Sequence, residues 1–251
     1  MRRRFRRSLG LWTAALSAVG CSISAQPGDA GPARRDAASA EDACTHSSRE
    51  VQVLVALGSS TVAGAGASDE AHRFVNIVAN TLDAPTLLNL GAGGQRAVQV
   101  VGALAEQARA AQPDVVVILA FTDYASSDGT IMAEAWRQVV QPLADDGARV
   151  YFGDVRIDPA WICGPVPTST GECYDVAEAD MIAAKNEIVE QVLAPIPNLV
   201  LVPVFDDTAA HPEWSTADGH PNDLGHANLA RTFLDVMQPD LLRRVCVEDG
   251  G

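Results

Sequence analysis

Apolar residues fall into five short runs, and each run is separated from the next by a longer stretch. The runs are rich in Val, Leu and Ile, whose side chains pack well on a pleated surface, so each run predicts a strand. The predicted strands cover 51–57, 87–90, 114–120, 149–155 and 199–205. The run at 114–120 is apolar almost throughout, and we expect it to be a central strand that is buried on both faces.

The stretches between the runs have apolar residues at helical spacing. Phe74, Val78 and Leu82, for example, recur every four residues before Pro85. The predicted helices cover 74–82, the stretch from Val98 to the residue before Pro113, 130–145, 175–194 and 222–237, and a long loop covers 157–174. We expect Asn222 to cap the last helix.

Strands and helices that alternate in this way predict an α/β fold. Five parallel strands form one sheet between two layers of helices, and right-handed crossovers make the sheet doubly wound. Ligands of such sheets bind beyond the carboxyl ends of the strands. The residues that follow each strand are therefore the candidates for function.

Four of the strands are followed by residues that fit nucleophilic catalysis. The segments are Gly-Ser-Ser-Thr-Val-Ala-Gly at 58–64, Gly-Ala-Gly-Gly at 91–94, Ala-Phe-Thr-Asp at 120–123 and Asp-Gly-His-Pro-Asn-Asp-Leu-Gly-His at 218–226. Together they supply a hydroxyl nucleophile, a histidine base, a carboxylate that orients the base, and backbone amides for an oxyanion. Acyl transfer is the reaction that needs this set.

The order and the sequences of these segments resemble the motifs of the SGNH (GDSL-like) hydrolases, over residues ~50–238. That resemblance implies a flavodoxin-like three-layer sandwich and an esterase, lipase, thioesterase or carbohydrate deacetylase activity. It also implies Ser60 as the nucleophile, His220 as the general base and Asp218 as the orienting carboxylate. The Ser60 and Gly94 amides, together with the Thr122 hydroxyl, would form the oxyanion hole.

Three positions depart from the family pattern. Ser59 stands where the family has Asp, and Thr122 stands where it has an oxyanion-hole Asn. Asp218 lies two residues before His220, whereas the family spacing is three. Asp206 or Asp207, after the last strand, is an alternative source of the carboxylate, and a third possibility is that the site has none.

Other glycine-rich and serine-containing sites do not fit. The stretch 58–66 lacks the Gly-Lys-Ser/Thr of a phosphate loop, and Gly64-Ala65-Gly66 lacks the third glycine of a dinucleotide fingerprint. An α/β-hydrolase elbow needs Gly-x-Ser-x-Gly, but Val62 fills the last place. His226 lies on the last predicted helix, and we expect it to be structural; we expect His72 to lie at the surface.

Residues 1–21 have the pattern of an export signal. A basic segment at 2–7 precedes an apolar stretch at 9–20, which is too short to span a membrane. The stretch ends in Ala-Val-Gly-Cys, which resembles a bacterial lipobox in which Cys21 is lipidated. Leu usually stands three residues before that cysteine, where this chain has Ala, so an ordinary secretory signal cut nearby is an alternative. The arginine run also permits a twin-arginine route.

The segment after this signal cannot pack a core. Residues 22–43 contain one large apolar residue, Ile23. We expect a flexible tether at 22–49, a hydrolase-like domain at 50–240 and a C-terminal tail at 241–251.

Five cysteines suit an oxidising compartment. If Cys21 carries lipid, four remain, and an even number in an exported protein implies two disulfides with three possible pairings. Cys163 and Cys173 flank a turn-forming segment, so their pairing is easiest, which leaves Cys44 with Cys246. No Cys-x-x-Cys or His-Cys group has the spacing of a zinc site, and we expect no metal.

The chain is acidic, with a formal net charge of −14. Five of its 18 basic residues lie in the first seven positions, so the chain after residue 21 carries 13 basic and 32 acidic residues, a net of −19. That charge disfavours nucleic-acid binding.

These features together predict a monomeric serine esterase of the cell envelope. It would need no cofactor, act on a small-molecule, carbohydrate or lipid ester, and touch the membrane only through its lipid anchor. The alternative hypothesis is a non-catalytic binding or scaffold lipoprotein on the same fold, because Thr122 and the Asp218 spacing depart from the family.

Overall fold

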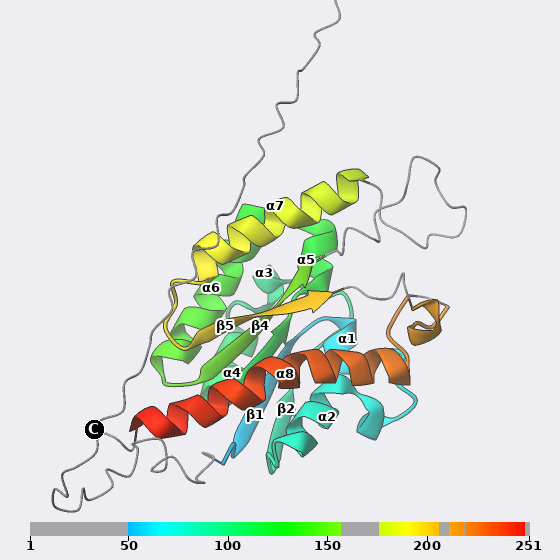
Figure 1. Cartoon of the computed structure of the whole chain (residues 1–251). Helices are drawn as coiled ribbons and strands as arrows, with labels where there is room; N and C mark the ends of the chain where they lie inside the picture. The colour runs from blue at the N-terminus through cyan, green and yellow to red at the C-terminus, as the bar shows by residue number, and fades with distance from the viewer. Residues whose placement is uncertain (1–49, 157–175, 206–210, 218, 249–251) are drawn as a thin grey trace, which may run out of the picture. The chain divides into compact units, whose positions relative to one another are not determined.

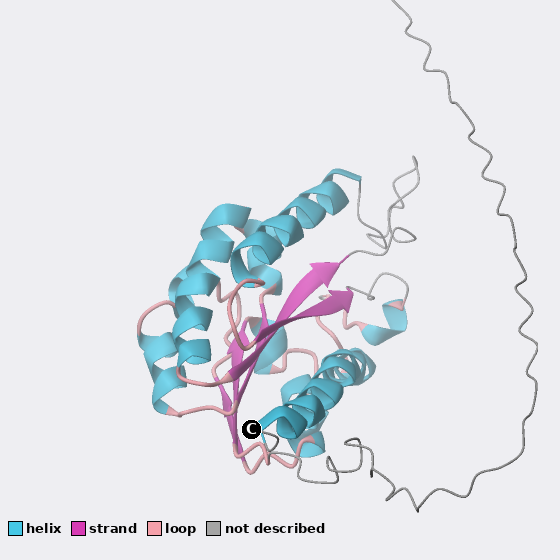
Figure 2. Ribbon diagram, turned by 60° about the vertical axis from the view of Figure 1, so that its left-hand side comes forward, coloured by secondary structure: helices cyan, strands magenta, loops and turns pink. Residues whose placement is uncertain are grey.

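The fold is a sheet between two layers of helices (Figures 1 and 2). It is seen in a computed structural model, which describes residues 50–156, 176–205, 211–217 and 219–248. All of these residues belong to a unit that spans Asp42–Gly251. None of the helices in these ranges is both long and apolar enough to cross a membrane.

Five parallel strands form the sheet, as predicted. They are β1 (Val53–Gly58), β2 (Thr86–Asn89), β3 (Val115–Leu119), β4 (Arg149–Arg156) and β5 (Leu199–Phe205). Their order is β2-β1-β3-β4-β5, which is the flavodoxin-like order. β3 pairs with both β1 and β4, and every one of its residues is buried. Its central place explains why its sequence is a continuous apolar run.

Helices cover both faces of the sheet (Figure 2). They are α1 (Ser60–Ala63), α2 (Phe74–Thr81), α3 (Ala97–Val100), α4 (Ala103–Ala110), α5 (Phe121–Ser126), α6 (Gly129–Asp145), α7 (Val176–Leu193) and α8 (Asp223–Glu248), with short 3-10 turns η2 (Glu70–His72) and η4 (Pro212–Trp214). Side chains of α3, α4, α6 and α7 form one core, which includes Val55 and Leu57 of β1. Those of α2 and α8 form the other, which includes Leu54 and Ala56.

The helices differ from the prediction in several places. The single helix expected from Val98 onward is two helices, α3 and α4, because Gly102 between them has a φ of 99° that a helix cannot contain. The short helices α1 and α5 were not predicted. The last helix continues to Glu248, so residues 241–248, where we expected a tail, extend α8.

The C-terminal half of α8 is held near the beginnings of the strands. Arg149, the first residue of β4, donates two hydrogen bonds of 2.7 Å to the Asp240 carboxylate, and the Tyr151 hydroxyl donates a third at 2.8 Å. A hollow of about 720 Å³ at this end is lined by residues 50–52, residues 81–83, Pro85, Gln238, Leu241 and Leu242. The part of α8 around residues 238–242 therefore lies beside the beginning of β1.

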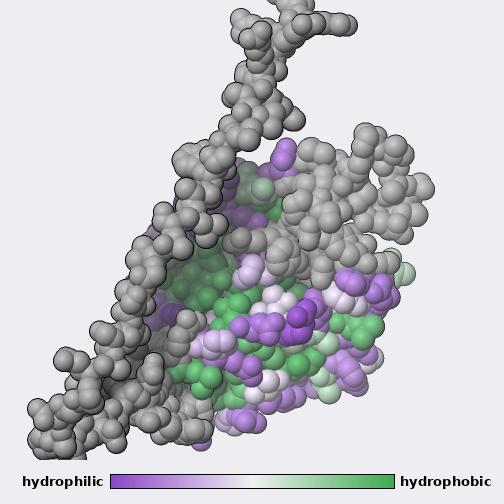
Figure 3. All heavy atoms as spheres, viewed as in Figure 1, coloured by the Kyte–Doolittle hydropathy of each residue, from purple (hydrophilic) through white to green (hydrophobic). Residues whose placement is uncertain are grey.

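Several large apolar side chains remain exposed on the described surface. Hydrophilic and hydrophobic residues are interspersed on the face shown in Figure 3. Four of the exposed apolar residues follow the carboxyl ends of strands, and they are Val98, Val101, Phe121 and Leu224, with exposed fractions from 38% to 58%. Val98 belongs to α3 and Val101 follows its last residue, while Phe121 and Leu224 belong to α5 and α8; these three helices begin at the end of the sheet where ligands bind.

Candidate active site

Ser60 lies at the first position of α1, two residues after β1 ends. The turn packs closely on β3, because a Cβ added to Gly58 would lie 2.4 Å from the Leu119 carbonyl oxygen. Ser59 is 2% exposed, whereas Ser60 is partly exposed. Of these two serines, Ser60 is therefore the one whose hydroxyl can meet a substrate.

His220 is held by the loop that leads into α8. Its carbonyl oxygen accepts hydrogen bonds from the Thr216 amide at 2.8 Å and the Thr216 hydroxyl at 2.9 Å. Ser215 and Pro221 form an antiparallel bridge on either side of this turn. The Nε2 of its imidazole lies 3.0 Å from the Ser60 Oγ. The structure thus brings together two predicted site residues that are 160 positions apart.

The predicted oxyanion loop is tied to the helix that begins with Ser60. The Asn89 side-chain amide donates to the Val62 carbonyl oxygen at 2.8 Å, and its Oδ1 accepts from the Gly91 amide at 2.9 Å. Gly91 packs so closely on α1 that an added Cβ would lie 2.6 Å from the Ala63 nitrogen. A Cβ added to Gly94 would meet no atom within 4 Å, so this part of the loop borders open space.

Gln95 also supports this arrangement. With its amide turned so that the nitrogen faces these carbonyls, its side chain donates to the Gly58 carbonyl oxygen at 2.7 Å and to the Leu90 carbonyl oxygen at 3.2 Å. It therefore joins the oxyanion loop to the turn before Ser60. Neither this role nor that of Asn89 was predicted from the sequence, because both depend on tertiary contacts.

Thr122 lies in α5, directly after β3, and its backbone alone is described. The next residue, Asp123, is buried and accepts hydrogen bonds from the Ala97 amide, the Ser127 hydroxyl and the Trp136 indole. Burial raises the pKa of the Asp123 carboxyl, although those three donors act in the opposite direction. Asp123 anchors the segment that carries Thr122.

Several sequence predictions lie outside the described residues. Asp218 and the alternative carboxylates at 206 and 207 are among them, as are Cys21, Cys44, Cys163 and Cys173, while Cys246 is described only through the backbone of α8. The predicted triad carboxylate and both disulfides therefore stay predictions.

His226 is buried and structural, as expected. Its Nδ1 accepts from the Phe74 amide at 3.3 Å, which places the proton on Nε2, and Nε2 donates to the Ala65 carbonyl oxygen at 3.0 Å. Burial lowers the pKa of this imidazole. The neutral ring makes both bonds, and a charged ring would lose the one from Phe74.

The Ser60–His220 pair has the geometry of a nucleophile and its base. A neutral imidazole with its proton on Nδ1 accepts the Ser60 proton at Nε2, and 3.0 Å is within reach for that transfer. Within the described part of the chain, no three His, Cys, Asp or Glu side chains are grouped so as to hold a metal ion. What the described groups can do is deprotonate a serine hydroxyl for attack on an electrophilic carbon.

Comparison with known proteins supports this interpretation. The sequence model of the GDSL-like Lipase/Acylhydrolase family matches residues 56–227. A search of curated proteins gave no significant match.

Solved structures share the fold. TesA has a TM-score of 0.60 at 20% identity, with 75% of this chain and 99% of TesA covered. The acetyl xylan esterase AlAXEase has a TM-score of 0.55 at 17% identity, with 74% and 99% covered. The esterase EstA from Pseudoalteromonas sp. has a TM-score of 0.55 at 16% identity, with 76% and 98% covered.

Proposed function

Because the chain belongs to the GDSL-like lipase/acylhydrolase family and is a serine hydrolase of ester bonds, we propose that it cleaves a carboxylic ester through an acyl-enzyme on Ser60. The observation that carries this proposal is the 3.0 Å separation of the Ser60 Oγ and the His220 Nε2.

The reaction has two halves. His220 takes the Ser60 proton while the Oγ attacks the ester carbonyl, and the same proton then passes to the departing alcohol. Water, deprotonated by His220, attacks the acyl-enzyme; the acid leaves and Ser60 recovers its proton. Asp218 would orient the imidazole, and the Ser60 amide, the Gly94 amide and the Thr122 hydroxyl would hold the oxyanion.

We propose a small-molecule, carbohydrate or lipid ester as the substrate. The apolar side chains of Val98, Val101, Phe121 and Leu224 support an ester with an apolar part, because they are exposed on or next to α3, α5 and α8, which begin beyond the carboxyl ends of the strands. AlAXEase is an acetyl xylan esterase, which makes acetylated sugars a class to include in a substrate panel.

We also propose that the protein is exported and held at the cell envelope by lipid on Cys21. The basic segment, the short apolar stretch and the small residues before that cysteine support this location. In cell fractionation, the Cys21→Ala variant should move from the membrane to the soluble fraction. Unchanged membrane retention would contradict the anchor.

The test of the activity is labelling with a fluorophosphonate probe, followed by assays on an ester panel. The wild type should be labelled and turn over esters, while Ser60→Ala and His220→Ala should lose both. Ser59→Ala is the matched control, since it removes the neighbouring hydroxyl, and it should still be labelled. A folded wild type with neither labelling nor turnover would instead support a binding or scaffold protein.

A further inference from the structure

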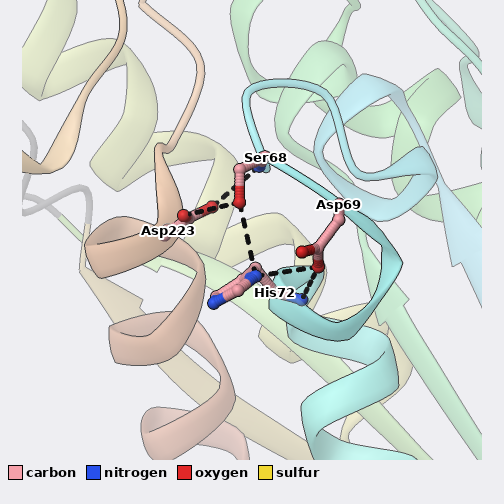
Figure 4. A network of polar contacts seen from close by, with 4 residues as sticks. All are labelled: Ser68, Asp69, His72 and Asp223. Carbon is pink, nitrogen blue, oxygen red and sulfur yellow. Dashed lines mark hydrogen bonds and ion pairs between the residues drawn. The ribbon is translucent and has the colours of Figure 1, made fainter.

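A polar network lies beside the candidate active site (Figure 4). One serine meets one carboxylate at two points: the Ser68 amide donates to the Asp223 Oδ1 at 2.8 Å, and the Ser68 hydroxyl donates to Oδ2 at 2.8 Å. These bonds lower the pKa of the Asp223 carboxyl. The carboxylate is therefore ionised at neutral pH, and both of its oxygens act as acceptors.

The network continues to a histidine. The His72 Nδ1 lies 2.8 Å from the Asp69 Oδ1 and 3.3 Å from the Ser68 Oγ. Because the Ser68 hydroxyl gives its proton to Asp223, its oxygen accepts from the His72 Nδ1–H. The His72 Nδ1–H is therefore shared between two acceptors, the Asp69 Oδ1 at 2.8 Å and the Ser68 Oγ at 3.3 Å, and the shorter bond to Asp69 is the stronger one.

The two segments that this network joins are the ones that carry Ser60 and His220. Ser68 belongs to the loop after α1, eight residues beyond Ser60. Asp223 is the first residue of α8, three residues beyond His220.

The two segments also pack closely at another point. Gly66 has a φ of 89°, and an added Cβ would lie 2.1 Å from the Pro221 carbonyl oxygen and 3.1 Å from the His220 Cβ. Any separation of the loop from the beginning of α8 would therefore also move His220 relative to Ser60.

We propose that Ser68 and Asp223 are positioning residues, which hold the Ser60 loop against the His220 segment and so maintain the contact between nucleophile and base. This inference rests on the proposed esterase function. Displacement of reacting groups by about 1 Å can cost up to ~100-fold in rate, so a two-point bond between these segments affects turnover without touching the ester.

A carboxylate is the side chain that suits this task. Asp223 accepts from two donors of a single residue, whereas an Asn amide would direct its own N–H groups at one of them. Ser68→Ala removes the hydroxyl and leaves the amide, so it should remove half of the contact. Ser68→Thr retains both donors.

The experiment compares these variants with p-nitrophenyl acetate as the substrate, well below every melting temperature. We expect kcat to fall about tenfold in Asp223→Ala and less in Ser68→Ala, with KM within about twofold of the wild type. The double variant should be no slower than Asp223→Ala alone, since the two residues act as one unit. Ser68→Thr should retain wild-type turnover, and fluorophosphonate labelling rates should follow kcat.

Asp240→Asn is the matched control, because it weakens a two-point contact of the same helix at the far end of the sheet. It should lower the melting temperature and leave kcat unchanged. The inference is wrong if Asp223→Ala and Ser68→Ala lose no more kcat than Asp240→Asn, or if their loss lies in KM. A wild type without Ser60-dependent turnover would contradict the esterase function itself. If Asp223→Ala does not fold, Ser68→Ala and Ser68→Thr still decide the question.

Discussion

Trp136 and Asp123 form a buried hydrogen bond between α6 and α5, with 3.0 Å between the indole Nε1 and the carboxylate oxygen. The same carboxylate accepts from the Ala97 amide at the beginning of α3. One side chain therefore joins the segments that follow β2 and β3, and these segments carry Gly94 and Thr122.

Replacing Asp123 should be costly to the fold. Asp123→Ala leaves the Trp136 and Ala97 N–H groups buried without an acceptor, so we expect the free energy of unfolding to fall by roughly 2–5 kcal/mol. Urea denaturation measures this loss. Asp128→Ala is the control, since it removes an exposed N-cap of α6 and should cost about 1 kcal/mol. Equal losses in the two variants would contradict the anchoring role.

Thr122→Asn tests the oxyanion hole. A threonine hydroxyl is shorter than an asparagine amide, and one well-placed donor is worth about 3 kcal/mol in the transition state. We therefore expect a slow wild-type esterase, with Thr122→Asn as fast or faster in kcat/KM. A large loss of rate in a folded Thr122→Asn would show that the threonine is the adapted donor.

Asp218→Asn tests the carboxylate of the triad. An orienting carboxylate fixes the tautomer of the base and stabilises its charged form, so its loss should reduce ester turnover by up to about 10⁴-fold without unfolding the protein. Asp206→Asn and Asp207→Asn serve as comparisons and should remain active. Near wild-type turnover in Asp218→Asn, beside an inactive His220→Ala, would rule Asp218 out.

His226 should make the protein sensitive to acid. Its pKa is lowered by burial, so its contribution to stability is present above about pH 6.5 and is lost as the pH falls through its lower folded-state pKa. His226→Gln should cost roughly 1–3 kcal/mol at pH 7.5, because it cannot satisfy both the Phe74 amide and the Ala65 carbonyl. The difference in the free energy of unfolding between His226→Gln and the wild type should shrink as the pH falls, which urea denaturation at each pH measures. A difference that does not change with pH would show that it does not come from the buried, neutral His226.

The pKa of His72 is shifted in the opposite direction to that of His226. The hydrogen bond to Asp69, helped by the charge of Asp223, raises its pKa above 6.5, so its contribution is present below that pH and is lost as the pH rises through the folded-state pKa. NMR titration of the ring should give a midpoint above 6.5 in the wild type. Asp69→Asn should lower that midpoint more than Asp223→Asn does. Identical midpoints in all three proteins would be inconsistent with the network.

The sheet was predictable because each strand is a short apolar run. The continuous run of β3 marks a strand buried on both faces, and the strand ends agree with the expected ones to within about two residues. The break between α3 and α4 was missed because Val98, Val101 and Ala105 keep helical spacing across it, although Gly102 ends the helix. α5 was missed because its six residues are too few to show a period.

The site was predictable only in part, for a similar reason. Ser60 and His220 stand in segments whose order the family shares, and the structure places them in contact. Ser68 and Asp223 carry no local signal, because their contact joins residues 155 positions apart. Such a pairing depends on how α8 crosses the sheet, and no periodicity in the sequence encodes it.

The position of the C-terminal part of α8 beside the beginning of β1 has a practical consequence. Both described ends of the domain lie toward the amino ends of the strands, whereas Ser60 meets His220 beyond their carboxyl ends (Figure 1). A linker or fusion partner can be joined at either end, and the domain can be fixed to a solid support there, without covering the candidate active site. Neighbouring ends also favour circular permutation, in which a short peptide joins the two and the chain is opened at another surface loop.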